Sequence, residues 1–236
     1  MGDENQFTYV RSLADDLAGP YLEVGSKNYG STQDLRSLFS AKGTYVGIDM
    51  EAGNGVDVVL DMTRDFDEVD ARLNGQRFGT VFCLSVLEHC EQPFQMAENL
   101  TRLLDADGKV CVSVPFAWKF HGYPSDYWRF THEGVKKLFP TLQFDMENSI
   151  ATRPGDGGFS PLNEDIAKIS FSSSYHRNRG HAVRGVSAAV FRMFSKVGLF
   201  RWLAGYRYVM APTMVSMIGT LRAETDAAGK SGSKAA

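Results

Sequence analysis

Short apolar runs alternate with helical segments along most of this chain, and this alternation is the feature that most restricts its fold. The runs predicted as strands are 21–24, 44–48, 57–60, 80–84 and 109–114, and the helical segments among them are 32–40 and 93–104. Nearly continuous apolar strands that alternate with helices are typical of a parallel sheet covered on both faces. We therefore predict an α/β fold with a doubly wound, mostly parallel sheet, whose ligands bind at the carboxyl ends of the strands.

The rest of the chain extends this pattern in both directions. The further predicted elements are a helix over 6–17, a turn over 105–108, a helix near 131–139, a strand near 142–149, a loop over 153–161 and a last strand over 213–221. The predicted domains are a core over 1–152, a basic helical insertion over 153–211, the last strand of the core over 212–224 and a disordered tail over 225–236.

Composition and charge fit one ordinary domain and argue against several function classes. Of the 236 residues 43% are hydrophobic and the formal charge is −3, which is unlike the strongly basic balance of a nucleic-acid-binding domain. Cys83, Cys90 and Cys111 lack CxxC spacing and lie in or beside apolar runs. This pattern favours a reduced protein over a disulfide scaffold or a zinc site. Because the first residues also lack the apolar segment of a secretory signal, we expect a cytoplasmic protein. Because the charge is not strongly basic, we expect no binding of nucleic acid.

The loop after the first strand separates two classes of nucleotide ligand. A dinucleotide site needs G-x-G-x-x-G, whereas residues 23–30 are EVGSKNYG. The carboxylate of Glu23 would repel a pyrophosphate and attract the ammonium group of a bound amino acid. Asp49, after the second strand, can accept hydrogen bonds from ribose hydroxyls, and Asp61, after the third, can accept from an adenine amine beside the backbone of Met62. Taken alone, Asp49 or Asp61 is equally well explained as a solvated loop carboxylate.

Together these segments resemble the class I S-adenosylmethionine-dependent methyltransferases, methyltransferase type 11-like, of a bacterial branch found with glycan or natural-product biosynthesis. The resemblance covers roughly 21–139 and rests on YLEVGS at 21–26, YVGID at 45–49, GVDVVLD at 55–61, LSVLEH at 84–89, DGK at 107–109 and HGYPSDYWRFT at 121–131. It implies S-adenosylmethionine as cofactor and a seven-stranded sheet of order 3-2-1-4-5-7-6 with strand 7 antiparallel. The predicted cofactor-binding residues are Glu23, Gly25, Ser26, Gly30, Asp49, Met50, Asp61, Met62 and Ser85.

Two histidines are candidates for the base that a hydroxyl acceptor would need. His121 begins an aromatic loop after the fifth strand, where Asp126 can orient it and raise its basicity, and His89 follows the fourth strand. We predict His121 as the base, His89 as the second candidate and Asp126 as the orienting residue. For His89, ordering of the loop together with Glu88 is the favoured alternative.

The same loop carries the candidate acceptor-binding residues Tyr127, Trp128 and Arg129. Arg129 can hold a carboxylate or phosphate, and the aromatic rings can exclude water. The alternative is a structural loop in which Asp126 pairs with Arg129 and Trp128 fills the core. The sequence has no HExxH or paired-histidine ligand set, so we predict that no metal is used.

Positive charge is concentrated in the last third of the chain. No acidic residue lies between Asp165 and Glu224, whereas nine Lys and Arg do. The stretch 183–204 has apolar residues at helical spacing along one side, but no apolar run is long enough to span a membrane. A lid on the core or a homodimer contact is the favoured prediction for this segment. Peripheral contact of 183–207 with an anionic membrane, at its inner face, is the alternative.

The sequence therefore predicts a biosynthetic transferase. It would move a methyl group from S-adenosylmethionine to a hydroxyl, favoured over an amine, of a sugar, a glycan or another small metabolite, with phosphorylated and lipid-linked acceptors included. Two alternatives stay open. One is another use of the same cofactor, such as aminopropyl transfer, and the other is a catalytically inactive module of the same fold with a binding or regulatory role.

Overall fold

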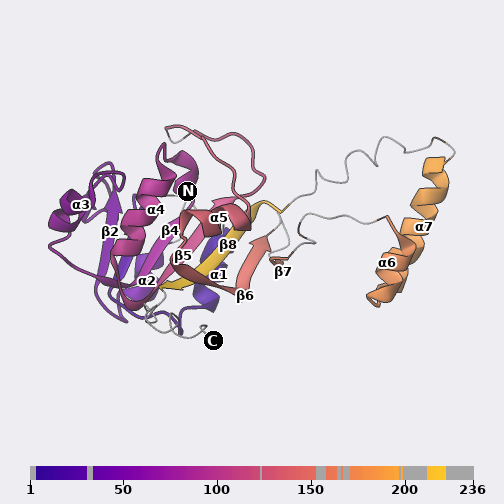
Figure 1. The fold of residues 1–236 in the computed structure, drawn as a ribbon, viewed down its shortest axis with the longest axis horizontal. Helices are drawn as coiled ribbons and strands as arrows, with labels where there is room; N and C mark the ends of the chain where they lie inside the picture. Colours follow the sequence, from indigo (N-terminus) through magenta and orange to yellow (C-terminus); the bar gives the residue numbers. More distant parts are fainter. Residues whose placement is uncertain are drawn as a thin grey trace, which may run out of the picture. The chain divides into compact units, whose positions relative to one another are not determined.

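The computed structural model describes residues 4–30, 34–122, 124–152, 158–163, 166, 171–196, 198 and 212–221. The chain divides into two compact units, one of Met1–Pro161 with Thr213–Ala236 and one of Leu162–Pro212. The first unit holds a mixed β-sheet with helices on both faces, and the second holds two helices (Figure 1). The predicted tail over 225–236 lies outside the described residues.

The sheet has eight strands. They are β1 (Tyr21–Val24), β2 (Tyr45–Asp49), β3 (Val58–Val59), β4 (Phe78–Leu84), β5 (Leu104–Pro115), β6 (Leu142–Thr152), β7 (Phe159–Pro161) and β8 (Met214–Leu221). Their order is β3-β2-β1-β4-β5-β8-β6-β7. The first five strands pair in parallel, and β8 is antiparallel to both β5 and β6. The prediction of seven strands was therefore wrong by one strand. The additional strand is β7, which lies at the edge of the sheet and within the segment predicted as a loop.

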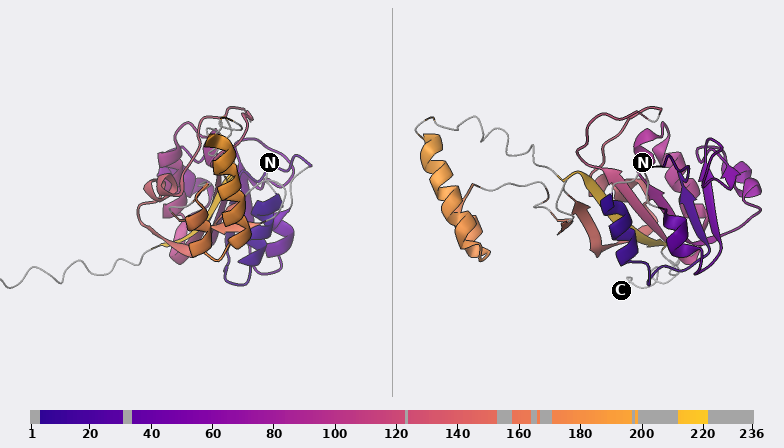
Figure 2. Two further views of the ribbon diagram at one scale, coloured as in Figure 1. Left: turned by 90° about the vertical axis from the view of Figure 1, so that its right-hand side faces the viewer. Right: turned by 180° about the vertical axis from the view of Figure 1, so that it is seen from behind.

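Helices cover both faces of this sheet. Those of the first unit are α1 (Glu4–Ser12), α2 (Leu35–Phe39), α3 (Phe66–Arg72), the 3-10 turn η1 (Leu87–His89), α4 (Pro93–Arg102) and α5 (His132–Leu138). α4 and α5 lie over the face seen in Figure 1, and α1 lies over the opposite face, seen from behind in the right-hand view of Figure 2. This two-sided cover explains why the parallel strands are mostly apolar on both of their faces.

An aromatic cluster between the sheet and its N-terminal helices forms part of the core. The ring of Phe39 on α2 lies 4.8 Å from Tyr21 on β1 and 4.9 Å from Phe82 on β4, measured between centroids. Tyr9 and Val10 of α1 belong to the same buried group. Because β1 and β4 are adjacent and parallel, alternate residues of both strands point to this one face and meet the helices there.

The start of β5 differs from the prediction. The segment over 105–108, predicted as a turn, lies within β5, where the pairing with β4 jumps from Phe78 opposite Leu104 to Thr80 opposite Lys109. Asp107 has a φ of +63° at this irregularity. The Asp-Gly sequence thus encodes a bulge in a long strand, because a positive φ is as suited to a bulge as to a turn.

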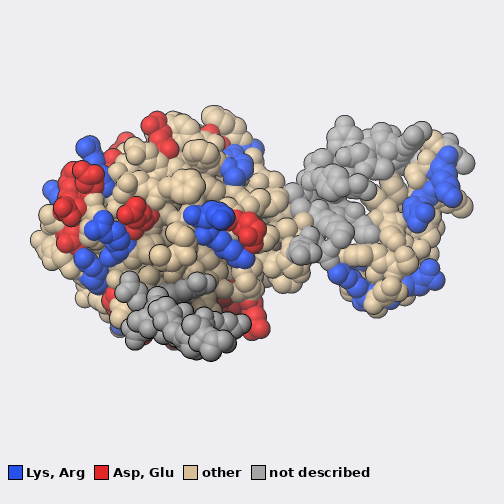
Figure 3. All heavy atoms as spheres, viewed as in Figure 1, with Lys and Arg blue, Asp and Glu red and all other residues tan. Residues whose placement is uncertain are grey.

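The second unit contains α6 (Ser173–Asn178) and α7 (Ala182–Lys196). The segment just before α6 packs on α7, since the rings of Phe171 and Phe191 stack with centroids 4.3 Å apart. On the described part of this unit, the face visible in Figure 3 carries Lys and Arg and no Asp or Glu. No helix in the described part of the chain is long and apolar enough to cross a membrane. The lid, homodimer and membrane-contact roles stay predictions.

We expect Phe82→Ala to lower the free energy of unfolding by about 3–5 kcal/mol, because it empties space among the rings of Tyr21, Phe39 and Tyr45. Phe82 is 0% exposed, whereas Phe94 on α4 is 65% exposed. The matched variant Phe94→Ala should change stability by roughly 0.5 kcal/mol or less. Urea denaturation followed by circular dichroism measures both. Equal effects of the two substitutions would contradict the placement of this core.

Candidate active site

A cavity of about 260 Å³ opens where β1 ends. It lies on the side of the sheet covered by α1 and α2, because residues of both helices line it. Its polar lining includes Gln6, Glu23, Ser26, Asp34, Arg36 and Asp57. Pockets that bind small molecules have volumes near or above this value, roughly 300–1,000 Å³. The cavity therefore lies where an open α/β sheet binds its ligand.

Gly25 makes the sharp turn that forms the floor of this cavity. Its φ is +74°, and a β-carbon at this position would lie 2.6 Å from Cγ2 of Val86. The backbone amides of Gly25 and Ser26 both donate to the carbonyl of Ile48, at 2.9 and 3.0 Å, which fixes the turn against β2. Only glycine meets both demands, because it tolerates positive φ and lacks the clashing atom.

The Glu23 side chain is half-buried and lines the cavity. The Tyr45 hydroxyl donates to its Oε2 at 2.7 Å, and no ion pair involves Glu23 among the described residues. The nearby Arg36 guanidinium lies 4.9 Å from the Tyr45 ring and donates to Asp57. Burial raises the pKa of Glu23 to about 7. A cation entering the cavity would stabilise the ionised carboxylate, as the sequence predicted for an ammonium ligand.

The Ser26 hydroxyl is also directed into buried space. Its oxygen has no hydrogen-bond partner in the described part of the chain. A buried hydroxyl without a partner costs free energy, so such groups usually meet a water molecule or a ligand. Together with Glu23 and Gly25, Ser26 brings three of the predicted cofactor-binding residues into one cavity.

Asp49 supports the glycine loop. Its carboxylate accepts from the backbone amide of Lys27 at 3.3 Å and from that of Glu51 at 3.0 Å. Lys27 Nζ in turn lies 2.6 Å from the Glu51 carboxylate. Asp49 is not among the residues that line the cavity, and its neighbour Met50 is exposed. Gly30, at the other end of the loop, has a φ of +82°.

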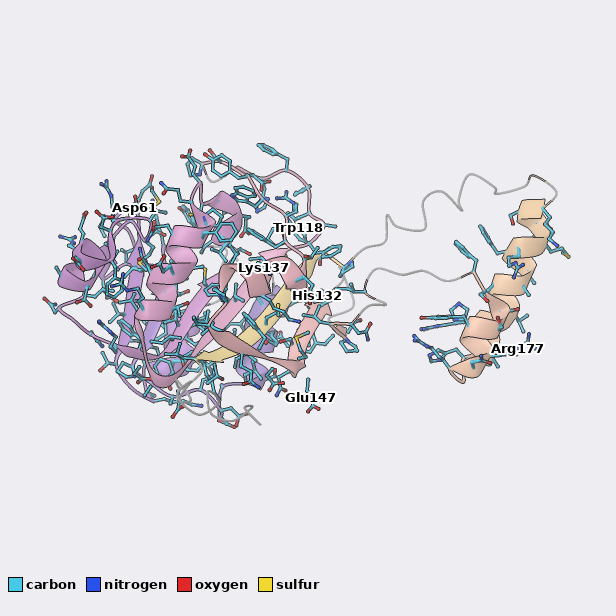
Figure 4. The ribbon with its side chains drawn as sticks, viewed as in Figure 1. Asp61, Trp118, His132, Lys137, Glu147 and Arg177 are labelled. Atoms are coloured by element: carbon cyan, nitrogen blue, oxygen red, sulfur yellow. The ribbon has the colours of Figure 1, made fainter. Side chains whose placement is uncertain are left out.

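The remaining predicted cofactor residues lie outside the cavity lining. The Asp61 carboxylate accepts from both the backbone amide and the hydroxyl of Thr63. Met62 is buried, and the Ser85 hydroxyl accepts from Gln6 at 2.7 Å. Figure 4 shows Asp61 along the edge of the sheet toward which the parallel strands run, and Trp118 along the same edge. The prediction that Asp61, Met62 and Ser85 contact a cofactor stays a prediction.

Several residues of the cavity lining were not predicted as site residues, and Gln6 and Asp57 are two of them. Gln6 of α1 is buried and donates to the hydroxyls of Ser85 and Ser113. Asp57, before β3, accepts from Arg36 and from the backbone amide of Gly47. Helical periodicity places Gln6 on a helix but cannot reveal which strand end the helix covers. Asp57 lies within the GVDVVLD segment at 55–61, but only the last aspartate of that segment was predicted as a site residue.

The two candidate bases lie together. The rings of His89, at the end of η1, and His121, in the loop after β5, have centroids 4.9 Å apart and an interplanar angle of 74°. His121 Nδ1 lies 3.2 Å from Oδ2 of Asp126, as the orienting role predicts. His89 Nδ1 lies 2.5 Å from the carbonyl oxygen of Ser125. Burial lowers the pKa of His89, which favours its neutral form.

Asp126 also pairs with Arg129. Two guanidinium nitrogens of Arg129 contact the two carboxylate oxygens, and they also donate to the carbonyls of Trp118, Lys119 and Trp128. This pairing holds the pKa of Asp126 well below its usual range. The ion pair of the structural alternative is therefore present together with the His121 contact. Arg129 is occupied within the loop, and its predicted contact with an acceptor stays a prediction.

Tyr127 and Trp128 are both exposed, so Trp128 does not fill the core as the structural alternative proposed. Each ring is held at its polar end. The Tyr127 hydroxyl donates to Glu91 at 2.8 Å, and the Trp128 indole donates to the carbonyl of Cys90 at 2.8 Å. The rings thus project from the sheet edge with fixed orientation, as a surface that stacks on an acceptor requires.

Glu88 was predicted only to help His89 order its loop, yet its surroundings are unusual. Its side chain is 0% exposed, and neither carboxylate oxygen has a hydrogen-bond partner among the described residues. Burial raises the pKa of Glu88 to about 7. An unpaired buried carboxylate beside two histidines is a costly arrangement, and such arrangements cluster at functional sites.

No family model and no curated protein sequence matches this chain. Its fold is similar to solved methyltransferase structures. An S-adenosylmethionine-dependent methyltransferase from Archaeoglobus fulgidus has a TM-score of 0.53 and 14% identity, over 92% of this chain and 94% of that one. A 1,6-didemethyltoxoflavin N1-methyltransferase from Burkholderia thailandensis, with 1,6-didemethyltoxoflavin and S-adenosylhomocysteine bound, has a TM-score of 0.52 and 11% identity. The match covers 93% of this chain and 79% of that one.

The N-methyltransferase NodS from Bradyrhizobium japonicum, in complex with S-adenosylhomocysteine, is also similar, with a TM-score of 0.50 and 9% identity over 93% of this chain and 87% of that one. At these identities the likeness establishes the fold. The chain has the α/β fold of class I S-adenosylmethionine-dependent methyltransferases.

We expect Glu23→Gln to change the pH dependence of stability. The carboxylate has a pKa of about 7 in the folded protein and 4.5 as its ordinary value. The wild type therefore loses stability as the pH rises from about 4.5 to 7, where only the unfolded chain has released this proton. The variant lacks that loss, so its relative stability should increase by up to about 3 kcal/mol across this window and then level off.

Thermal melts from pH 4.5 to 8 measure this difference. Asp34, Arg36 and Tyr45 influence Glu23 but are present in both proteins, so the comparison isolates the single carboxylate. Glu98→Gln, at an exposed position on α4, is the matched control and should follow the wild type at every pH. A constant difference between wild type and Glu23→Gln would mean that the Glu23 pKa is not raised.

Proposed function

We propose that this protein is a methyltransferase that uses S-adenosylmethionine and acts on a small-molecule acceptor. The observation that carries the proposal is the cavity formed by Glu23, Gly25 and Ser26 at the end of β1. A half-buried carboxylate beside a positive-φ glycine suits an amino-acid ammonium group and disfavours a pyrophosphate. The fold, established by its similarity to methyltransferases, supports the same ligand class.

The residues of the cavity fit this cofactor. Glu23 would hold the ammonium group, the Ser26 hydroxyl would gain the partner that it lacks in the described chain, and Gly25 lets the backbone approach closely. Asp49 would position the loop and face the ribose. The bound cofactor supplies an electrophilic methyl group on a sulfonium. The chain's own contribution is to place the acceptor in line with that group and to exclude water.

For the acceptor we propose a hydroxyl of a sugar or another small metabolite. A hydroxyl must lose its proton as it attacks, and His121 is suited to take it because Asp126 accepts from its backbone amide at 2.9 Å and lies beside its Nδ1. Tyr127 and Trp128 would stack on the acceptor. An amine acceptor is the second candidate, since two similar structures are of N-methyltransferases.

Two other uses of this fold remain as rival proposals. Aminopropyl transfer would need the same ammonium and ribose contacts, so the cavity alone supports it equally. An inactive binding module would keep the cavity but would have no need for the paired histidines beside it. The His89 and His121 arrangement is the observation that favours an enzyme.

We expect calorimetric titration at pH 7.5 to detect S-adenosylmethionine binding and no binding of a nicotinamide dinucleotide. Wild-type affinity should rise roughly five- to tenfold from pH 6 to 7.5, because Glu23, with a pKa of about 7, ionises in this range while the ligand's ammonium stays largely protonated. Glu23→Gln should bind more weakly with a flat pH profile, and Glu98→Gln should match wild type. Dinucleotide binding without S-adenosylmethionine binding would overturn the proposal.

An acceptor is first identified by incubating the protein and S-adenosylmethionine with a panel of hydroxyl and amine compounds and measuring the S-adenosylhomocysteine formed. With that acceptor, we expect His121→Gln to lower kcat by about 100-fold or more. The matched control is His181→Gln, at an exposed position in the second unit. Affinity for S-adenosylmethionine should be the same in all three proteins. If His121→Gln and His89→Gln both retain full turnover, neither histidine acts in the reaction.

A further inference from the structure

We propose that Glu88, His89 and His121 form a binding site for a divalent transition-metal ion. Each residue offers one ligand atom, and these three atoms all lie within 4.8 Å of one another. Glu88 and His89 belong to η1 after β4, and His121 lies in the loop after β5, so the site is at the carboxyl edge of two adjacent parallel strands. This proposal replaces the sequence-based prediction that no metal is used.

The buried state of Glu88 is the first argument for an ion. The side chain is fully buried, and no donor in the described part of the chain meets either carboxylate oxygen. Removing an ionised carboxylate from water is unfavourable unless a cation or hydrogen-bond donors compensate. A metal ion held jointly with two imidazoles would supply that compensation, which neither histidine provides through a hydrogen bond in the described structure.

The proton positions on the two histidines are the second argument. The Ser125 carbonyl can only accept, so its 2.5 Å contact places the proton of His89 on Nδ1 and leaves the Nε2 lone pair available. His121 Nδ1 likewise lies 3.2 Å from the Lys119 carbonyl and 3.2 Å from the Asp126 carboxylate. Metal-binding histidines characteristically donate their second nitrogen to a carbonyl or carboxylate in this way.

The segments that carry the ligands are also fixed to each other. The Tyr127 amide donates to the Glu88 carbonyl at 2.8 Å, and the Trp128 indole donates to the carbonyl of Cys90. Arg129 holds Asp126 through both carboxylate oxygens. Bonds of about 2.0–2.2 Å place neighbouring ligand atoms roughly 3.3–3.5 Å apart, so binding needs side-chain movements of at most about 1.5 Å on this braced frame.

Two imidazoles and one carboxylate favour ions such as Zn²⁺, Mn²⁺, Fe²⁺ or Co²⁺ over Ca²⁺. Three protein ligands leave a coordination position open, which is the arrangement of catalytic sites rather than structural ones. An acceptor hydroxyl at that position would lose its proton more readily. This role rests on the proposed function, and the histidines would then act as ligands in place of a free base. Binding of the ion itself does not depend on the proposed function or on the catalytic role.

The test is titration of chelator-treated full-length protein with Zn²⁺ and Co²⁺. We expect one ion per chain, and visible absorption bands on Co²⁺ binding that change in the variants. We expect binding to be weakened by at least about 100-fold in each of the variants Glu88→Gln, His89→Asn and His121→Asn. Losing a group that only hydrogen-bonds to a metal ligand lowers affinity by up to about 100-fold, and losing a ligand itself should cost at least as much. Glu98→Gln and His181→Asn, the matched exposed controls, should bind like wild type.

Circular dichroism establishes that each variant is folded, and the two histidine variants carry the test if Glu88→Gln does not fold. Absence of saturable Zn²⁺ and Co²⁺ binding in the micromolar range, or equal binding by wild type and the three variants, would overturn the proposal. Calorimetric titration of the metal-free protein with S-adenosylmethionine tests the proposed function separately. Cofactor binding without metal binding would overturn the metal site alone, and metal binding without cofactor binding would overturn the proposed function alone. Turnover that depends on the added ion would support the catalytic role, and full turnover of metal-free protein would refute that role.

Discussion

The turn at Gly25 is the constraint on which the rest of the site depends. Its positive φ directs the chain out of β1, and the missing β-carbon leaves space that Val86 occupies. The first consequence is a cavity with Glu23 and Ser26 in its wall. The second is that the end of β1 contacts the segment after β4 that leads to His89. One residue without a side chain therefore brings two groups of polar residues to one edge of the sheet.

Both groups contain a carboxylate withdrawn from water, Glu23 partly and Glu88 fully, that no ion pair in the described chain neutralises. Glu23 receives a hydroxyl from Tyr45 while the nearby Arg36 is held by Asp57, and Glu88 receives no donor from the described chain. Each carboxylate destabilises the folded protein at neutral pH. A fold retains such costs where function needs them, because a ligand that binds the native state returns the lost stability.

The sequence predicted the part of the fold that local pattern controls. Strands β1, β2 and β4 were predicted from apolar runs, and the glycine loop from its composition. The edge strand β7 was missed because three residues carry no periodic signal, and the bulge in β5 was taken for a turn because both use the same residues. Gln6, Asp57 and Glu88 gain their meaning from contacts across long sequence separations, which periodicity does not report.

The distance between the two groups along the chain explains how one fold can serve two substrates. The cavity lies at the end of β1, whereas the paired histidines follow β4 and β5. Ser85, just after β4, accepts a hydrogen bond from Gln6 of α1, which lines the cavity. A transfer reaction needs donor and acceptor held on opposite sides of the moving group. Parallel strands meet that need because their ends form one row. In the proposed reaction the end of β1 would hold the donor, and the loops after β4 and β5 would hold the acceptor, so residues of those loops such as His121, Tyr127 and Trp128 would select the acceptor.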